Sequence, residues 1–565
     1  MRRDISPSIA PSEWRWVIIF SGLLVAITLL PYAWAFASNS PSDYWVFMGI
    51  LVNPKDEASY LAKINEGAQG AWLFTLPYTA ENQTGAAINE FYLLLGHIAR
   101  LTGLSSLLMF HISRLVTGFV MYLSFYYLGS VIWPRLRPRR LFFSLLAVGS
   151  GLGWLYLVLF GRVAAPATIS TSTDFVVPES IPFYSTFTNP HFPLAIALIA
   201  LLAAYFVTAF RPGFEDQPGF ANGGLTVAAL TIALAIVQPQ GLVPIAAGLC
   251  VYVVVLAIHE RRIPWREINW VTLVILPASP FFVYYFALTL ENPAIRIWNA
   301  QNNTPSPPII NYLFGFGLLL IVAIPGIIRA IRHFERDGDQ FMVVWLIVNA
   351  LALYAPTNIQ RRFAIGLIIP VVYFAVRALE DYWFHRIKVP WRDAALVALY
   401  VFIVPSNILA LSIPLFAVFQ PSAGIKAQSL LYRPEAEAVQ WLAANGSAGD
   451  VVLAPANVSV WMPAYSDLRV VSGHDYETLN YVEKQAAVDA WYKTGQNCQE
   501  LLATNSVRYV VSQYSPPPTI LDAASSSSAD STNTTITANN TNNACIQTLG
   551  EPVKSLDGVD IYAIP

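Results

Sequence analysis

The stretch "WVIIFSGLLVAITLLPYAWAFA", residues 16–37, contains no charged side chain. A helix of this length crosses the ~30 Å hydrocarbon core of a lipid bilayer. The run is longer than the core of a signal peptide, and no small-residue cleavage pattern followed by a soluble chain comes after it. We therefore expect a retained membrane anchor at the start of the chain.

Ten further apolar runs follow this one, and together they predict a polytopic α-helical membrane protein with about eleven transmembrane helices. The region 224–258, around Gln238-Pro239-Gln240, fits either two short helices or one broken helix on hydropathy alone. The predicted spans are residues 16–37, 106–132, 141–160, 191–210, 224–238, 240–258, 269–289, 309–330, 340–356, 363–380 and 394–417.

The overall composition agrees with a membrane protein. Of the 565 residues, 55% are hydrophobic and 12% are charged, whereas soluble domains average about 25% charged residues. The net charge of -2 does not supply the basic face that binding to nucleic-acid phosphates requires, so we expect no nucleic-acid partner.

Arginine and lysine residues predict the orientation, because they collect in short cytoplasmic loops. The basic clusters all fall on one side when the Gln238 region is counted as two spans, which favours eleven spans, a cytoplasmic N-terminus and an extracytoplasmic C-terminus. The clusters are Arg2, Arg3 and Arg15; Arg135, Arg137, Arg139 and Arg140; Arg261, Arg262 and Arg266; Arg329, Arg332 and Arg336; Arg386, Lys388 and Arg392.

We predict two domains, a transmembrane domain over residues 1–417 and an extracytoplasmic α/β domain over 418–565. The transmembrane domain has a long first outer loop, 38–105, and shorter outer loops at 161–190 and 290–308. The first loop contains two stretches with helical spacing of apolar residues, which we expect to lie along the membrane surface.

In the α/β domain we predict helices at 434–444 and 477–492 and strands at 450–454 and 507–511. Residues 523–543 form a low-complexity insertion rich in Ser, Thr and Asn. Cys498 and Cys545 both lie in this domain, and a disulfide between them is an open alternative that depends on an oxidising compartment.

The first outer loop contains "NPKDEASYLAKINEG", residues 53–67, with two adjacent acids. In a helix, Asp56 and Tyr60 share one face, whereas Glu57 points about 100° away, so only one carboxylate can aim at a given atom. A carboxylate beside apolar surface can serve as a general base toward a hydroxyl or amine. The alternative is an ordinary solvated charge.

A second polar group is "TNIQRRF", residues 357–363, between two late spans on the predicted outer side. Arg361 and Arg362 oppose the positive-inside bias and have no acid close in sequence. Guanidinium groups suit phosphate oxygens, so we expect them to bind a carrier phosphate. Contact with lipid headgroups or an ion pair with the C-terminal domain are the alternatives.

Three weaker candidates complete the predicted site. His191 in "TNPHFP" begins the fourth span, and Arg296 lies in the outer loop "NPAIRIWNAQNN". With Tyr60, these are expected to contact substrate or carrier, although a lone histidine is more often structural. The segment "SGHDYET", residues 472–478, is expected to be a loop before a helix and offers no metal site by itself.

This arrangement resembles the GT-C glycosyltransferase superfamily, which includes protein O-mannosyltransferases and the lipid A aminoarabinose transferase. The resemblance covers about residues 1–415 in architecture, and its local motif is Asp56-Glu57 followed by Tyr60. It implies inverting transfer of a sugar from a polyprenyl-phosphate carrier, with Asp56 as the acid that activates the acceptor and basic residues near later helix ends on the carrier phosphate.

The resemblance also implies the partners. These are a polyprenyl-phosphate-linked sugar donor, membrane lipids and a glycan, lipid or protein acceptor that the sequence does not define. No cofactor is expected. Metal-dependent members carry acidic motifs in later outer loops, where this chain has only isolated acids such as Asp174 and Glu179, so we expect a metal-independent mechanism while a divalent metal stays open.

Two other function classes stay open. A transporter or flippase for lipid-linked glycans also needs many spans, but it predicts inverted repeats and charges within the helices. We find no internal repeat, and most of the charge lies at helix ends. A non-catalytic membrane subunit that assembles with an enzyme is the other class, and the sequence gives little evidence against it.

Overall fold

The computed structural model describes residues 9–159, 172–211, 220–336, 338–514 and 544–565. The predicted low-complexity insertion at 523–543 lies outside this range. The chain divides into two compact units, each treated by itself. The first comprises Met1–Pro31, His111–Ala287 and Asn303–Ile413, and the second comprises Tyr32–Phe110, Leu288–Asn302 and Pro414–Pro565.

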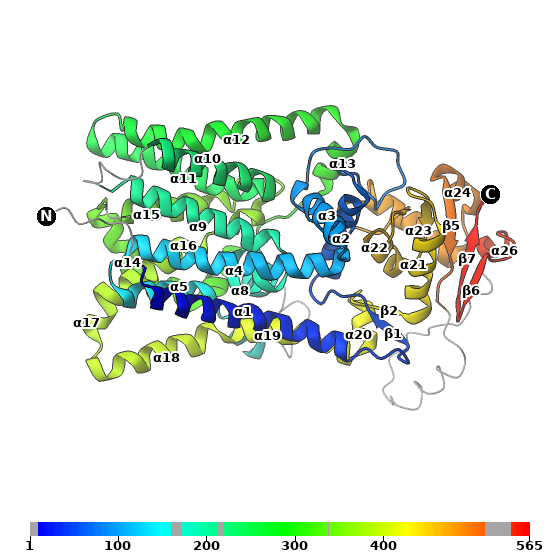
Figure 1. The fold of residues 1–565 in the computed structure, drawn as a ribbon, viewed down its shortest axis with the longest axis horizontal. Coiled ribbons are helices and arrows are strands. Elements are labelled where there is room, and N and C mark those ends of the chain that lie inside the picture. Colours follow the sequence, from blue (N-terminus) through cyan, green and yellow to red (C-terminus); the bar gives the residue numbers. More distant parts are fainter. Residues whose placement is uncertain (1–8, 160–171, 212–219, 337, 515–543) are drawn as a thin grey trace. The chain divides into compact units, whose positions relative to one another are not determined.

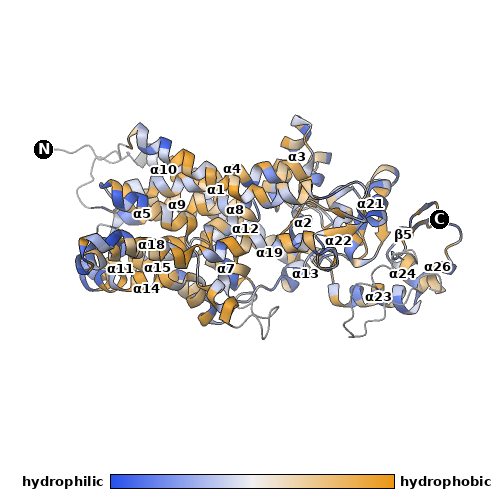
Figure 2. Ribbon diagram, turned by 90° about the horizontal axis from the view of Figure 1, so that it is seen from below, coloured by the Kyte–Doolittle hydropathy of each residue, from blue (hydrophilic) through white to orange (hydrophobic). Residues whose placement is uncertain are grey.

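The first unit is built from long apolar helices, coloured mostly orange by hydropathy in Figure 2. Some of these helices continue beyond the unit's boundaries. They are α1 (Pro11–Ala37), α4 (Ser106–Ile132), α5 (Leu136–Val148), α9 (His191–Ala209), α10 (Phe220–Val237), α11 (Pro239–Glu260), α12 (Trp265–Glu291), α14 (Ile309–His333), α15 (Asp339–Ala352), α16 (Ile368–Ala378), α18 (Arg392–Ile403) and α19 (Pro405–Phe419), as labelled in Figure 1.

Eight helices or helix combinations within the described residues are long and apolar enough to cross a membrane. A ninth is obtained if α5 and Gly153–Leu159, which meet at 46°, form one span. The two remaining predicted spans correspond to shorter apolar helices, α10 and α15. The chain is therefore an integral membrane protein, and each predicted span coincides with helix, but the count of eleven crossings is not confirmed.

The region 224–258 forms two helices. Gln238 has φ −156° and ψ 76°, outside the helical region, and Pro239 begins the next helix. A proline disfavours the α conformation of the residue before it, so the chain turns out of the helix at Gln238. This agrees with the two-helix alternative.

A backbone hydrogen bond joins two helix breaks in the first unit. Gly317 has φ 46° and ψ −126° and interrupts α14. Near this break the Phe314 carbonyl accepts a hydrogen bond from the Leu152 N–H at 2.8 Å, in the break after α5. The buried Asp174 carboxylate accepts from the Gly153 N–H at 3.1 Å. This isolated acid thus caps a helix start, which is a structural role.

The second unit contains a five-stranded mixed sheet with the order β4-β3-β5-β7-β6. β3 is parallel to β4 and β5, whereas β7 is antiparallel to β5 and β6. The predicted strands at 450–454 and 507–511 correspond to β3 and β5. The strands are β3 (Val451–Leu453), β4 (Arg469–Val470), β5 (Val507–Val511), β6 (Lys554–Leu556) and β7 (Val559–Ala563).

Helices surround this sheet (Figure 1). The helix predicted at 434–444 is α21, whereas the one predicted at 477–492 starts later, at Tyr481. Residues before it form a turn, and Asn480 has φ 54°, a left-handed conformation that cannot continue into the helix. The helices are α20 (Pro421–Lys426), α21 (Arg433–Asn445), α22 (Ala456–Tyr465), α23 (Tyr481–Thr494), α24 (Cys498–Thr504) and α26 (Ala544–Gln547).

The first outer loop belongs to this second unit. Its helices α2 (Pro54–Gln69) and α3 (Glu90–Thr102) pack together, and α2 also packs on α22. The apolar residues of α2, such as Leu61 and Ile64, are fully buried in a core shared with α21 and α22. The expectation that α2 lies along the membrane surface is therefore wrong, because protein covers its apolar face.

The crossing of α2 and α3 depends on two glycines. A Cβ atom added at Gly67 would lie 2.2 Å from the Leu93 carbonyl oxygen, and one added at Gly96 would lie 2.1 Å from the Ile64 carbonyl oxygen. The two backbones can approach this closely only without side chains at these positions. β1 (Trp45–Phe47) pairs antiparallel with β2 (Leu430–Tyr432), which also ties the loop to the C-terminal part.

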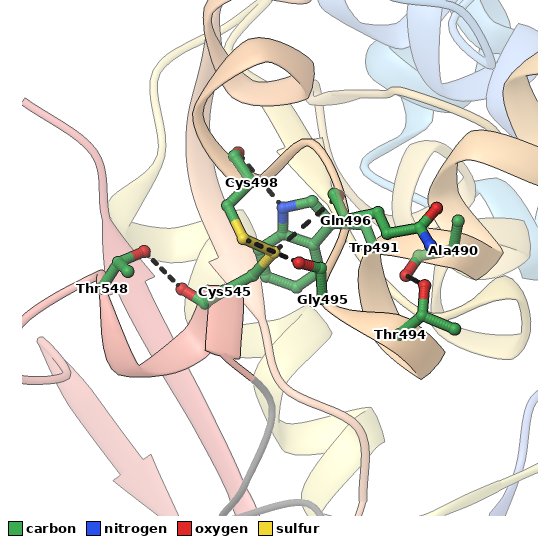
Figure 3. Close-up of a disulfide and its surroundings, with 8 residues drawn as sticks. All are labelled: Ala490, Trp491, Thr494, Gly495, Gln496, Cys498, Cys545 and Thr548. Atoms are coloured by element: carbon green, nitrogen blue, oxygen red, sulfur yellow. Dashed lines mark hydrogen bonds between the residues drawn. A yellow bond between two sulfur atoms is a disulfide. The ribbon is translucent and has the colours of Figure 1, made fainter.

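A disulfide joins Cys498 and Cys545, which was one of the two possibilities left open by the sequence (Figure 3). It links α24 to α26, and the Trp491 indole N–H of α23 donates to the Cys498 carbonyl at 3.3 Å. The bridge thus connects α24 and α26, and the indole hydrogen bond adds α23 to them.

Replacing Cys498 and Cys545 by serine is expected to lower the unfolding free energy of the second unit by about 4 kcal/mol, because the bridge closes a loop with a sequence separation of 47 residues. Thermal unfolding followed by tryptophan fluorescence measures the loss. Cys250→Ser, which removes an exposed thiol of the first unit, is the control and should leave the transition unchanged. Equal transitions for all three proteins would contradict this expectation.

Candidate active site

Asp56 lies in the first turn of α2 and is held at both carboxylate oxygens. Asn53 Nδ2 donates to Oδ2, and His474 Nε2 lies 3.2 Å from Oδ1. Pro54 starts the helix, and Asn53 before it is left-handed with φ 40°. The positive end of the helix dipole favours a negative charge at this position. The Asp56 side chain is 37% exposed, so it is fixed in direction yet open to a reactant.

The hydrogen bonds of His474 define its tautomer. Its Nδ1 accepts from the backbone N–H groups of Tyr476 at 3.1 Å and Glu477 at 3.2 Å. An acceptor nitrogen carries no proton, so in the neutral ring the proton is on Nε2 and points at Asp56. His474 is buried and therefore orients the carboxylate instead of accepting a proton from substrate.

Two ion pairs accompany this contact. Lys55 pairs with Asp475 at the surface. Lys63 pairs with Glu477, and their side chains are only 2% and 6% exposed. Lys63 Nζ also donates to Ser59 Oγ at 3.1 Å. The loop before α23 therefore holds α2 through a histidine, a surface pair and a buried pair.

The conformation of this loop is itself fixed by hydrogen bonds. Thr478 Oγ1 accepts from the backbone N–H groups of Gly473 and His474 and donates to the Tyr78 carbonyl at 2.7 Å. Gln301, at the end of α13 (Pro293–Gln301), donates to the carbonyls of Tyr476 and Thr478. Three separate parts of the chain thus determine where His474 points.

One further carboxyl group lies on α2. Burial raises the pKa of Glu66 to about 7, while hydrogen bonds from Thr75 and the nearby Lys63 charge oppose the rise. Burial thus favours the neutral form of Glu66, and the nearby Glu477 charge adds to the rise of its pKa.

The other predicted residues of the second unit occupy different settings. Glu57 is completely buried, in agreement with the expected difference in direction from Asp56. Tyr60 stacks on Tyr92 of α3, with ring centroids 4.6 Å apart. Arg296 is exposed on α13. Among Asp56, Glu57, Tyr60 and Arg296, Asp56 is the residue that combines exposure with a buried partner that orients it.

In the first unit, His191 is the first residue of α9 and is buried beside Phe192. Arg361 and Arg362 lie in a 3-10 turn, η2 (Gln360–Ala364). The backbone N–H of Arg361 donates to the Thr304 carbonyl at 3.0 Å, and its buried Nε has no hydrogen-bond partner among the described residues.

Arg361 and Arg362 have no acid close in sequence, but an acid lies close to them in space. The short turn η1 (Pro178–Ser180) packs on η2 and carries the buried Glu179. An acid separated by about 180 residues from the arginines thus comes next to their turn, which hydropathy and loop charge alone do not reveal.

The described residues contain no group of three or more His, Cys, Asp or Glu side chains arranged to hold a metal ion. At Asp56 the donor set is also unsuitable, because both ring nitrogens of His474 are already engaged in hydrogen bonds.

No protein-family model matches the chain, and no curated protein matches it. The crystal structure of the Archaeoglobus fulgidus oligosaccharyltransferase in complex with Zn and sulfate matches with a TM-score of 0.52 and 14% identity, over 88% of this chain and 67% of that one. The same enzyme tethered to an acceptor peptide with an NVT sequon matches with a TM-score of 0.53, 13% identity and coverages of 88% and 68%.

The chain has the fold of an archaeal oligosaccharyltransferase. At this level of identity the likeness concerns the oligosaccharyltransferase fold alone, and at that level the resemblance to GT-C glycosyltransferases is confirmed. The crystal structure of ArnT from Cupriavidus metallidurans bound to undecaprenyl phosphate also matches, with a TM-score of 0.48, 14% identity and 98% coverage of each chain.

The buried pair can be tested by substitution. Lys63→Met leaves Glu477 as a buried charge without its ammonium partner and is expected to destabilise the second unit by about 3–5 kcal/mol. The double variant Lys63→Met/Glu477→Leu should recover most of this loss, since no uncompensated charge remains. Unfolding of the purified protein, followed by fluorescence, measures both.

Lys493→Met provides the matched control, because the Lys493–Asp489 pair is exposed and is expected to contribute less than about 1 kcal/mol. A double variant as unstable as the single variant would show that Lys63 does not act through Glu477.

Proposed function

We propose that the chain is a membrane glycosyltransferase that transfers a sugar from a polyprenyl-phosphate carrier to an acceptor on the extracytoplasmic side. One observation carries the proposal. In a chain with the oligosaccharyltransferase fold, Asp56 is a partly exposed carboxylate whose two oxygens are held by Asn53 and by the buried His474. Such an oriented carboxylate suits a general base.

In the proposed reaction, an acceptor hydroxyl or amine attacks the anomeric carbon of the sugar. Its proton moves to the Asp56 carboxylate as the new bond forms. The bond between the sugar and the carrier oxygen breaks, and its electron pair leaves with the polyprenyl phosphate. Each carboxylate oxygen has two lone pairs, so the bonds from Asn53 and His474 leave room for the acceptor. A single displacement inverts the anomeric configuration.

We assign the base to Asp56 and not to Glu57, since the Glu57 side chain is completely buried. We propose that Arg361 and Arg362 bind the carrier phosphate. The buried Nε of Arg361, which has no hydrogen-bond partner among the described residues, supports this role. Tyr60, His191 and Arg296 are kept as proposed contacts to substrate or carrier.

We propose that the mechanism needs no metal at Asp56. Support comes from the donor set, in which both nitrogens of His474 are engaged. We also propose that the N-terminus is cytoplasmic and the second unit extracytoplasmic. The arginine clusters favour this orientation, and the Cys498–Cys545 disulfide fits an oxidising compartment.

The base is tested with Asp56→Asn in the purified full chain. The assay follows label from sugar-labelled undecaprenyl- and dolichyl-phosphate hexoses into host membrane acceptors. Loss of the base is expected to lower the transfer rate by about 100-fold or more. Asp489→Asn, on the surface of α23, is the control and should transfer normally. Full transfer by Asp56→Asn would refute the role, and flipping of the donor without transfer would favour a transporter.

The same assay distinguishes a positioning role of His474 from a purely structural one. His474→Leu removes the N–H donor and is expected to lower kcat about 10-fold with little change in KM. His474→Gln keeps a donor at a similar place and should restore most of kcat. A loss of equal size in both variants, together with a lowered melting temperature, would indicate a structural role only.

For the phosphate role, Arg361→Gln is expected to weaken binding of labelled undecaprenyl phosphate about 10-fold, the size of one charge-assisted hydrogen bond. Arg332→Gln, an exposed arginine in the last turn of α14, is the matched control. Equal affinities of the two variants would remove Arg361 from the carrier site.

A further inference from the structure

A cavity of about 400 Å³ opens between α1, α5 and α18 of the first unit. Its walls are mainly apolar and include Trp16, Leu141 and Leu396, while Arg137 and Arg140 supply charge. The volume lies in the range of about 300–1,000 Å³ found for small-molecule sites. We propose that this cavity binds the phosphodiester headgroup of an anionic membrane phospholipid.

Arg140 is the central residue of this proposal. Its guanidinium carbon lies 4.9 Å from the centre of the Trp16 ring, which fixes the side chain against the cavity wall. Its buried Nε has no hydrogen-bond partner, and Arg140 forms no ion pair within the described residues. A guanidinium in this position needs an anion, and a phosphate accepts its forked N–H groups well.

The neighbouring Arg139 and Arg137 differ from Arg140 in their hydrogen bonds and ion pairs. Arg139 is buried, and its Nε donates to the Trp133 carbonyl at 2.6 Å while Nη1 lies 3.2 Å from Glu13. Its role is structural. Arg137 is 47% exposed, and its Nε lies 3.5 Å from Glu380, a long contact at the surface that leaves other N–H groups for a ligand.

The start of α5 adds to the positive potential. Arg135 at its N-cap makes no side-chain capping bond, so the first N–H groups of this helix, including that of Leu136 at the cavity wall, have no side-chain cap. The positive end of a helix dipole attracts an anion. The helix end thus acts together with the two arginines and does not stand alone.

The surroundings of the cavity favour a lipid over a free anion. Leu136 is 41% exposed at the wall, and Trp391 in the turn η4 (Val389–Trp391) before α18 is 66% exposed. Tryptophan collects at the headgroup level of membranes. In Figure 2 hydrophilic residues also gather at the end of the bundle where α5 begins. Basic pockets of this kind between helices bind anionic lipid headgroups.

The inference is separate from the proposed sugar transfer. Arg137 and Arg140 belong to a cluster that predicts the cytoplasmic side, whereas the transfer is proposed for the extracytoplasmic side. The ligand would be a lipid of the cytoplasmic leaflet that binds α1, α5 and α18 together. Loss of transfer in Asp56→Asn and loss of lipid in Arg140→Gln can therefore be observed independently.

The test compares lipid binding to the purified full chain in detergent by native mass spectrometry. Phosphatidylglycerol and phosphatidylcholine with identical acyl chains are the two probes. Phosphatidylglycerol is expected to bind tighter, and Arg140→Gln is expected to weaken it about 10-fold, the size of one charge-assisted hydrogen bond. Arg135→Gln removes the same charge from an exposed neighbour outside the cavity and should stay within about twofold of the wild type.

Several results would overturn the proposal. They are equal affinity for both lipids, an equal loss in Arg135→Gln and Arg140→Gln, displacement of phosphatidylglycerol by excess inorganic phosphate, or its displacement by undecaprenyl phosphate. The third would assign the cavity to a free anion, and the fourth to the carrier. If Arg140→Gln is not monodisperse, Arg137→Gln replaces it, because Arg137 also lines the cavity and its side chain is 47% exposed.

Discussion

The second unit depends on the buried ion pair between Lys63 and Glu477. Two charges taken out of water are stable only while they remain paired and hydrogen-bonded, so any shift of α2 along its axis would leave both without a partner. The pair therefore specifies the register of α2 against the loop before α23 more than it adds to stability. Because Asp56 lies two turns before Lys63 on the same helix, that register also determines which way the candidate base points.

The same physical principle explains the arginines of the first unit. Arg139 and Arg140 are adjacent in sequence, yet Arg139 bonds to Glu13 and to a backbone carbonyl, while Arg140 packs on Trp16 beside a cavity. In a chain with few charged residues, a guanidinium that finds no acid within the fold marks a place for an external anion. Arg361 in η2 shows a related case, although Glu179 lies on the turn packed against it.

Much of the fold could be predicted from local sequence. Apolar runs predicted where helices lie, the side of the basic clusters favoured two spans around Gln238, and the strands predicted at 450–454 and 507–511 correspond to β3 and β5. The different surroundings of Asp56 and Glu57 followed from the helical period alone. The number of crossings stays a prediction, since α10 and α15 are among the shorter apolar helices of the described residues and are not counted with the long candidate spans.

The partner of Asp56 could not be predicted, because His474 follows it by 418 residues and belongs to a loop with no periodic pattern. The apolar face of α2 suggested a membrane surface for the same reason, since α22, which packs on α2 together with α3, comes from the C-terminal part. The segment "SGHDYET" carries two acids and a histidine, and residues 53–67 carry two lysines and three acids. This match of charges is the one signal that could have suggested the pairing.

The distance along the chain between α2 and its partners has a consequence for biosynthesis. Lys55, Asp56 and Lys63 meet residues that follow them by 414 to 420 positions. At about 5–20 residues per second, the ribosome needs roughly 20–80 s to produce those partners. During that time α2 has emerged without α22 on its apolar face and without Glu477 beside Lys63, although α3 is already made. A newly made chain therefore passes through a period in which this helix depends on lipid or on a chaperone for cover.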